Sequence, residues 1–185
     1  MTALLIIIGV VVLIAILMYN SLIGKKNQVE NIFAGVDTVL KKRFDLIPNL
    51  VASVSQYMEH EKSTLEKVTE LRAAAMKPGI SDDQKIALDA KLTSALGAIN
   101  LAMEAYPDLK ANENVMHLQR SLNEIEEQIS AARRAYNQAV TDLNNAIEMF
   151  PTNLMAGWMN LSRRAVFEIT VTERQNVDVR ALFNK

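Results

Sequence analysis

The chain has 185 residues, of which 50% are hydrophobic, 22% charged, 5% aromatic and none cysteine, and 20 Lys and Arg against 21 Asp and Glu give a net charge of −1. These values are typical of one ordinary domain and exclude a disordered chain, a disulfide scaffold and a cysteine-ligated metal protein. The balanced charge gives no reason to expect nucleic acid as a partner.

The first 24 residues contain no Lys, Arg, Asp or Glu, and residues 3–18 include nothing more polar than Gly9. At ~1.5 Å per helical residue the apolar run covers about 24 Å and the uncharged stretch about 36 Å, which bracket a hydrocarbon thickness of ~30 Å. The pattern predicts a transmembrane anchor over residues 1–24. A cleaved secretory signal is the alternative, but no positive region precedes the run and no small-x-small site follows it.

Lys25 and Lys26 follow the anchor directly, whereas only the α-amino group precedes it. Positive charge is retained on the cytoplasmic side of a spanning helix. We therefore expect a single-pass protein with its N-terminus outside and its C-terminal part in the cytoplasm.

Residues 20–76 have helical periodicity, with apolar residues spaced by three and four. The first of these form a membrane-proximal stripe of Val29, Phe33, Val36 and Leu40. Pro48 lies inside this stretch, and because proline removes a backbone donor and clashes with the preceding turn, the helix either kinks or breaks there.

The next helix is predicted over residues 82–105. Lys77-Pro78-Gly79 reads as a turn, and Ser81 with Gln84 forms a capping box in which each side chain accepts a hydrogen bond from a backbone N–H of the other residue. Pro107 follows the last apolar position, so we expect this helix to end before it.

Residues 112–149 carry the strongest periodicity in the chain, with Asn112 as the expected cap and Pro151 after the end. The apolar positions alternate spacings of three and four, which is typical of coiled-coil packing. Together with intervening alanines, this seam consists of Val115, Leu118, Leu122, Ile125, Ile129, Tyr136, Leu143 and Phe150. The pattern does not tell whether the partner helix belongs to the same chain.

The short connections between these segments predict an all-α fold, in which the transmembrane helix leads into an up-and-down antiparallel bundle of long helices. The 82–105 helix would be only about 36 Å long and would cover part of the first helix. Either the first helix folds back near Pro48 to give four helices, or the membrane-proximal stripe stays uncovered and needs a second subunit.

The C-terminal part, residues 151–185, is predicted to hold a short helix near residues 152–161, which contains Trp158, and an extended tail. The tail is expected because residues 167–172 alternate between apolar and polar with a period of two.

No catalytic residue, metal site or cofactor is predicted. His60-Glu61 begins like a zinc-protease motif, but Thr64 stands where the second histidine is required, and His117 is the only other histidine. Phosphate-binding glycine motifs are absent as well, so we expect no enzyme. The cluster Lys41-Lys42-Arg43 is either a solvated helix face or a binding surface for an acidic lipid or partner.

Several stretches carry a family resemblance. They are residues 19–23 (YNSLI), 26–29 (KNQV), 40–51 (LKKRFDLIPNLV), 57–61 (YMEHE), 105–112 (AYPDLKAN), 132–137 (ARRAYN) and 149–153 (MFPTN). On these the chain resembles the LemA family of bacterial membrane proteins, whose domain would correspond to residues 25–150. The resemblance implies a short outer N-terminus, one spanning helix in the bacterial inner membrane, and a helical bundle without established enzymatic activity. Residues 162–168 depart from the family pattern, so no function is transferred to the tail.

Two functions are compatible with this sequence. The first is a structural scaffold that is anchored in the bilayer, forms homo-oligomers through apolar stripes such as the membrane-proximal one, and organises or remodels the membrane. The second is a binding module or adaptor for another membrane protein, such as a quality-control protease or a signalling component.

Overall fold

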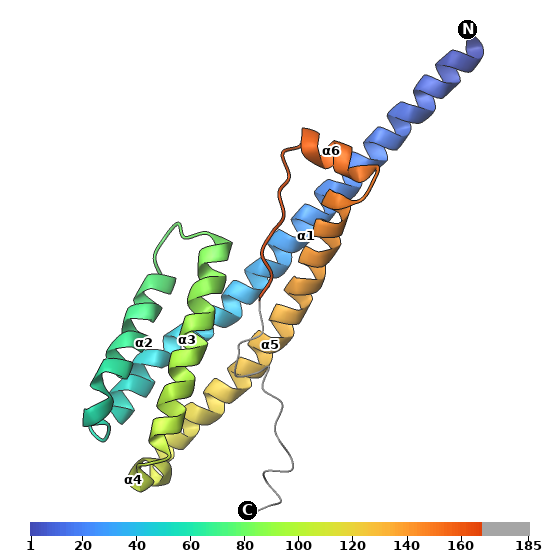
Figure 1. Cartoon of the computed structure of the whole chain (residues 1–185). Coiled ribbons are helices and arrows are strands. Elements are labelled where there is room, and N and C mark those ends of the chain that lie inside the picture. Colours follow the sequence, from blue (N-terminus) through green and yellow to red (C-terminus); the bar gives the residue numbers. More distant parts are fainter. Residues whose placement is uncertain (168–185) are drawn as a thin grey trace, which may run out of the picture.

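The computed structural model describes residues 1–167, and in this part of the chain the fold is all-α, as predicted (Figure 1). The helices are α1 (Thr2–Val54), the 3₁₀ turn η1 (Glu59–Glu61), α2 (Lys62–Ala75), α3 (Asp82–Met103), α4 (Pro107–Ala111), α5 (Glu113–Glu148) and α6 (Thr152–Trp158).

Helix α1 is one continuous helix of 53 residues, so it is about 80 Å long. Its first part, which carries the predicted anchor, stands free of the bundle, and the anchor therefore continues directly into the bundle (Figure 1). Within the described residues, two helices are long and apolar enough to cross a membrane. The most apolar 18-residue window of α1 has a mean hydropathy of 3.0 with none of it buried, whereas that of α3 has 1.2 with 33% buried, as befits a core helix.

Pro48 lies inside α1 and neither ends nor interrupts it. Because Pro48 has no N–H, the carbonyl of Phe44 four residues earlier has no partner within the helix. The guanidinium of Arg72 in α2 takes that place, donating from Nε to the Phe44 oxygen at 2.7 Å. The helix thus passes through the proline because a neighbouring helix supplies the missing donor.

The chain reverses after Val54, through residues 55–58 and η1, so the helical stretch 20–76 is divided, but not at Pro48. The fold-back alternative is confirmed, with the turn six residues beyond Pro48. Helices α2 and α3 then form a hairpin beside the lower part of α1, and α5 runs back along α1 toward its free end (Figure 1).

Local sequence signals place the remaining ends. The Ser81 capping box is present, with the Gln84 N–H donating to the Ser81 hydroxyl at 3.2 Å and the Ser81 N–H to the Gln84 amide oxygen at 3.0 Å. The preceding turn has Gly79 at φ +79°, a conformation that glycine adopts without strain. Asn112 caps α5 by accepting bonds from two backbone N–H groups. These three predictions from sequence are confirmed.

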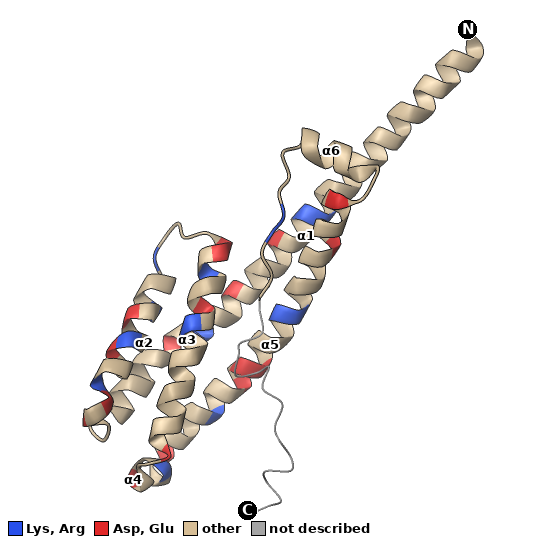
Figure 2. Cartoon of the chain, viewed as in Figure 1, with Lys and Arg blue, Asp and Glu red and all other residues tan. Residues whose placement is uncertain are grey.

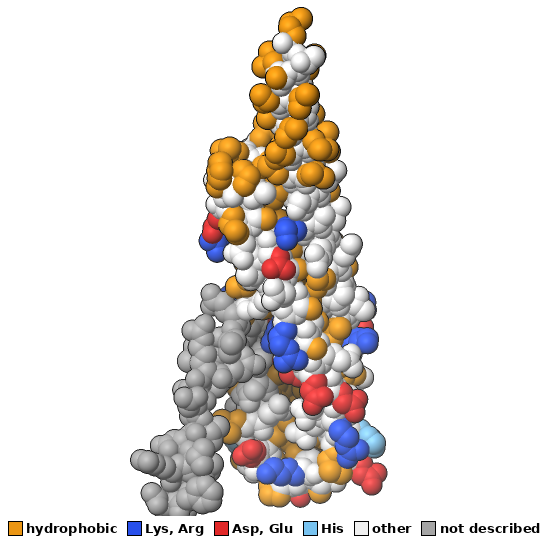
Figure 3. Space-filling model, turned by 90° about the vertical axis from the view of Figure 1, so that its right-hand side faces the viewer, with side chains coloured by type: hydrophobic (Ala, Val, Ile, Leu, Met, Phe, Trp, Pro, Cys, Tyr) orange, Lys and Arg blue, Asp and Glu red, His pale blue; other side chains and the backbone are white. Residues whose placement is uncertain are grey.

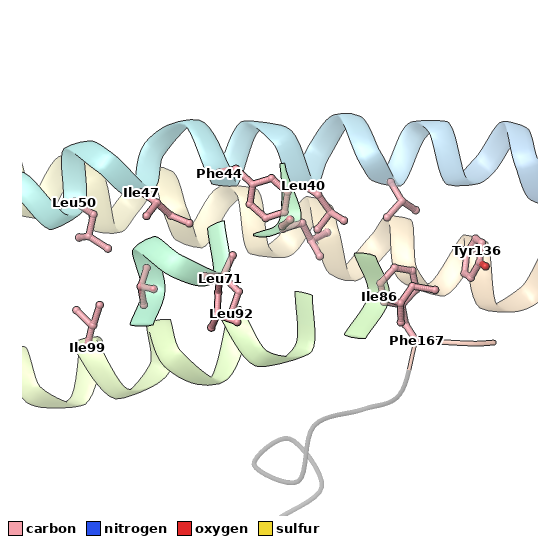
Figure 4. Packing of buried hydrophobic residues seen from close by; sticks show 14 of the residues in the cluster. Leu40, Phe44, Ile47, Leu50, Leu71, Ile86, Leu92, Ile99, Tyr136 and Phe167 are labelled. Atoms are coloured by element: carbon pink, nitrogen blue, oxygen red, sulfur yellow. The ribbon is translucent and has the colours of Figure 1, made fainter. Parts of the chain in front are cut away.

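The core follows the inner face of α1. In its lower half, Leu40, Phe44, Ile47 and Leu50 point toward Leu71, Leu92 and Ile99 of the α2–α3 hairpin (Figure 4). Facing them from the other side is α5, whose contacts with α1 are the most extensive in the molecule.

The membrane-proximal stripe is part of this core. Val29, Val36 and Leu40 are 0% exposed and Phe33 is 6% exposed, so the idea that they form a self-association surface is wrong for the folded chain. The expectation compared the length of the first helix with that of the 82–105 helix alone. Helix α5 has 36 residues and a length of about 54 Å, and it covers what α3 does not reach.

The seam of α5 is partly confirmed. Val115, Ile129, Tyr136 and Leu143 are buried, whereas Leu118, Leu122 and Ile125 are half-buried. Phe150 was wrongly included, because α5 ends at Glu148 and the Phe150 side chain is 79% exposed.

The short helix after Pro151 is confirmed as α6, and an extended segment of residues 161–167, which we call the strap, follows it. Of the alternating stretch 167–172, all but Phe167 lies outside the described residues.

Candidate functional site

The three helices α1, α3 and α5 are joined by an ionic cluster of Arg43, Asp89, Thr93, Glu126 and Arg133. Arg43 of α1 donates to one oxygen of Asp89, to the Thr93 hydroxyl at 3.0 Å and to Glu126 at 2.8 Å. Arg133 of α5 takes the other Asp89 oxygen, with its two nitrogens at 2.5 and 3.1 Å.

The cluster is buried at its centre, open to solvent at Glu126, and balanced in charge. Arg43 and Asp89 are each 1% exposed, and two arginines face two carboxylates. Burying one such charge alone costs several kcal/mol, so removing a partner is far more damaging than losing a surface ion pair. Both Asp89 oxygens accept bonds from arginine, so this carboxylate is engaged within the cluster. The geometry fixes the relative register of three helices, as a polar group at a core position does in coiled coils.

The cluster Lys41-Lys42-Arg43 does not act as one unit. Lys41 pairs with Asp45 at 2.8 Å on the exposed face, Lys42 is exposed, and Arg43 points into the core. Both predictions for this cluster, a solvated face and a binding surface for an acidic lipid or partner, are therefore wrong for Arg43. The burial of Arg43 could have been inferred from the sequence. The buried positions of α1 recur every seven residues, at Leu22, Val29, Val36, Arg43 and Leu50. Arg43 stands at a core position of this heptad pattern.

An aromatic group continues the core above the ionic cluster. Tyr136 of α5 lies between Phe33 of α1 and Phe167 of the strap, with ring centroids 5.4 and 5.3 Å apart. Burial raises the pKa of the Tyr136 hydroxyl above its ordinary value, and within residues 1–167 this hydroxyl has no hydrogen-bond partner. Arg133 also lies over the Phe167 ring, 5.7 Å from its centroid, and so links the aromatic group to the ionic cluster.

The strap is attached to α5 by two asparagines. The Asn137 amide accepts from the backbone N–H of Phe167 and donates to its carbonyl, both at 2.8 Å. Asn144 does the same with Arg164, both at 3.0 Å. Seven helical residues advance ~10.5 Å and three extended residues advance ~10 Å, so this spacing matches the asparagines to every third strap residue. This pair was not predicted from the sequence. The available signal was that each asparagine directly follows a seam residue, Tyr136 or Leu143.

The region around His60 forms a turn that contacts Tyr106, which lies between α3 and α4. Glu59, His60 and Glu61 form the η1 turn, and Glu61 accepts a hydrogen bond at 2.8 Å from the Tyr106 hydroxyl. This bond raises the pKa of Tyr106 above its ordinary value. Among residues 1–167, no group of three His, Asp or Glu side chains is placed to hold a metal ion.

Comparison with known proteins gives a consistent result. The model of the LemA family matches residues 32–180. A protein named LemA from Metamycoplasma hominis is 29% identical over 165 residues, which is 89% of this chain and 75% of the relative. Two magnetosome proteins of Paramagnetospirillum magneticum, MamQ 1 and MamQ 2, are each 23% identical over 189 residues, covering 88% of this chain and 70% of each relative. Because the family model covers most of the sequence, the chain belongs to the LemA family.

Proposed function

We propose that this chain is a membrane-anchored structural protein without enzymatic activity, whose helical bundle stands on the cytoplasmic side of a bacterial inner membrane. The observation that carries the proposal is the continuity of α1. One helix begins as a bare apolar rod and becomes the central element of the core, with no flexible joint between the two parts.

The exposed apolar part of α1 supports the proposal that this helix is inserted in a bilayer. The large apolar side chains between Leu4 and Leu17 are 47–67% exposed, in a segment without any charged residue. Leaving such a rod in water is costly at ~25 cal/mol per Å² of apolar surface. Lys25 and Lys26 come immediately after it and favour a cytoplasmic bundle.

A retained anchor is favoured over a cleaved signal by the position of Leu22. This side chain is 0% exposed, and it lies four residues after Met18, the last residue of the apolar run. Cleavage near residue 20 would cut α1 where it enters the folded region. Signal peptides are removed from a segment that is not built into the mature fold.

Extraction with alkaline carbonate tests the anchor. We expect the full-length chain to stay in the membrane pellet and a Leu13→Arg variant to be released, because a charged residue at the centre of a span costs ~2.5–3.5 kcal/mol. Leu13→Ala is the matched control and should stay in the pellet. Release of the unaltered chain, or its recovery in a shortened form, would contradict the proposal.

The scaffolding part of the proposal requires copies to associate at membrane level. Among the described residues, the large uncovered apolar side chains gather on the free part of α1 and around α6, whereas those on the bundle are scattered singly. The bundle's own apolar stripe is filled by α5 and offers no second interface. We therefore place association within the bilayer rather than between bundles.

An adaptor for another membrane protein is the second candidate. The observation that favours it is the bundle itself, which buries its core within one chain. Such a bundle needs no second copy to fold, and its polar surface is free to bind another protein. The mass of detergent-extracted particles distinguishes the two. Multimers support a scaffold, and a single copy per particle supports an adaptor.

A further inference from the structure

Helix α6 and the two residues before its Pro151 cap expose an unusual amount of apolar surface. Met149, Phe150, Leu154 and Trp158 are 63%, 79%, 67% and 76% exposed. No charged residue occurs from Met149 to Leu161. Four large apolar side chains within ten residues form a patch that a soluble protein normally covers.

This patch lies beside the anchor. A shallow cavity between α6 and α1 is lined by Met155 and Trp158 on one side and on the other by residues of the predicted span, namely Val12, Ala15, Ile16 and Tyr19. Figure 3 shows the hydrophobic side chains covering the free end of α1 and a shoulder at the level of α6, and the charged side chains visible on this face begin only below that level.

The level along α1 gives a depth in the bilayer. Val12 precedes Gly24, the last uncharged residue of the anchor, by 12 residues, which correspond to about 18 Å along the helix. Half of a hydrocarbon core is ~15 Å. Tyr19, at the other end of this lining, precedes Gly24 by only 5 residues, or about 8 Å. With α1 across the membrane, α6 is therefore level with the inner part of the leaflet nearer the bundle, as far as the bilayer middle.

Backbone groups at both ends of α6 are hydrogen-bonded within the chain. This matters in an apolar environment, where each unsatisfied polar group costs several kcal/mol. At its start, the N–H groups of Asn153 and Leu154 donate to the carbonyls of Met149 and Pro151. At its end, Asn160 has a φ of +52°, which closes the helix in a Schellman motif. There the Asn160 and Leu161 N–H groups donate to carbonyls within α6, at 3.1 and 3.0 Å.

Charged side chains mark where this apolar segment ends. Glu148 before it and Arg163 after it form an ion pair. Arg164 bridges Glu30 and Asp82, both at 3.2 Å, and Glu30 also lies 3.8 Å from Lys26. In Figure 2, α6 and the part of α1 above it carry no Lys, Arg, Asp or Glu, and charged residues first appear on α1 and α5 just below α6. The arrangement is that of a membrane interface, with paired charges in water and apolar side chains beyond them.

We propose that α6, together with Met149 and Phe150, is a second membrane segment that enters one leaflet without spanning it. It rests on the proposed function, because the bilayer must be the one that α1 crosses. Phe150 and Leu154 face the acyl chains, and Met155 and Ala156 face α1 and the bundle. Trp158 borders the cavity beside α1 but is 76% exposed, so most of its surface is open to lipid. Trp, Phe and Leu are the side chains that helices lying in a membrane interface bury at the boundary between headgroups and acyl chains. Each copy thus inserts a wedge into one leaflet only.

Trp158 is the only tryptophan, so its fluorescence reports on α6 without labelling. The full-length protein is reconstituted into phosphatidylcholine vesicles with bromine atoms at either the upper part or the end of the acyl chains. We expect blue-shifted Trp158 emission and loss of most of it in the brominated vesicles. Emission typical of water without quenching would overturn the proposal. A blue shift without quenching would also overturn it, because protein would then be covering Trp158.

A Trp158→Phe/Leu13→Trp variant separates this proposal from the proposed function. Its tryptophan lies near the middle of the anchor and should be quenched most by the terminal bromines. Quenching at position 13 without quenching of Trp158 would leave the anchor in place and reject the wedge, whereas quenching at neither position would reject both. In a Phe150→Asp/Leu154→Asp variant, the Trp158 emission should shift to the red and escape quenching, because aspartates disfavour insertion. Persistent quenching there would also contradict the wedge.

Discussion

At the scale of single residues, two arginines join α1 to its neighbours. One is a buried charge that needs partners, and the other replaces a hydrogen bond that proline removes. Arg43 brings a charge into the core and finds Asp89, Glu126 and Thr93 there. Arg72 supplies the donor that Pro48 cannot. Both contacts join residues of different helices, so their energetic value depends on tertiary structure and not on helix propensity.

The Arg72 contact predicts a specific coupling. Arg72→Ala should lower the free energy of unfolding by about 1.5–3 kcal/mol, the usual value of a hydrogen bond to a charged group. In a Pro48→Ala background the same change should cost clearly less, because the backbone N–H restored at position 48 then bonds to the Phe44 carbonyl. Denaturant unfolding of the four proteins of this cycle in detergent measures the difference. Equal costs in both backgrounds would show that Arg72 does not serve this carbonyl.

At the scale of elements, the strap depends on α5 rather than on a strand partner. Each asparagine amide offers one donor and one acceptor, which imitates the edge of a neighbouring β-strand. Phe167 then completes the aromatic group with Tyr136 and Phe33. The strap thereby ties the C-terminal end of α5 to the face between α1 and α3.

Loss of the two asparagines should release the strap. In an Asn137→Ala/Asn144→Ala variant we expect trypsin to cut after Arg163 and Arg164 much faster than in the unaltered chain, because an extended segment must leave its partner to enter a protease. Asn145→Ala removes an exposed asparagine of the same helix and serves as the control. Unchanged cleavage in the double variant would mean that the strap is held by other contacts.

The sequence allowed the helices to be predicted well where the signal is local. Capping at Ser81 and Asn112 and the heptad spacing in α5 depend on neighbours within one turn or two. The place of the reversal, after Val54, was missed because nothing between residues 49 and 58 is a strong helix breaker, while Pro48 is one that the fold tolerates. The ionic cluster and the asparagine pair were missed because each requires partners that lie 20 or more residues away in the chain.

At the scale of the whole molecule, the apolar surface divides into two classes. The stripe from Val29 to Leu40 is sealed inside one chain, and the surface at the level of the anchor is open. Sequence periodicity reports that a face is apolar but not which element covers it. This is why the same heptad pattern was compatible with a subunit interface.

Substitution in the sealed stripe should therefore unfold the chain rather than separate copies. Leu40→Asp places a charge at a fully buried position, and we expect loss of cooperative thermal unfolding or of expression. Lys42→Asp, at an exposed position on the same helix, is the control and should keep the fold. A Leu40→Asp protein that stays folded, with a smaller particle mass, would restore the stripe as an interface between copies.

With its proposed anchor in a bilayer, the uninterrupted α1 would act as a lever. From Gly24 to Val54 the helix extends about 45 Å beyond the anchor. Spanning helices tilt by ~20° on average, and by more in thinner bilayers, so such a tilt carries the tip near the α2–α3 hairpin sideways by about 15 Å. With α1 anchored as proposed, a change in bilayer thickness would be converted into a displacement of the bundle, with no moving joint in between.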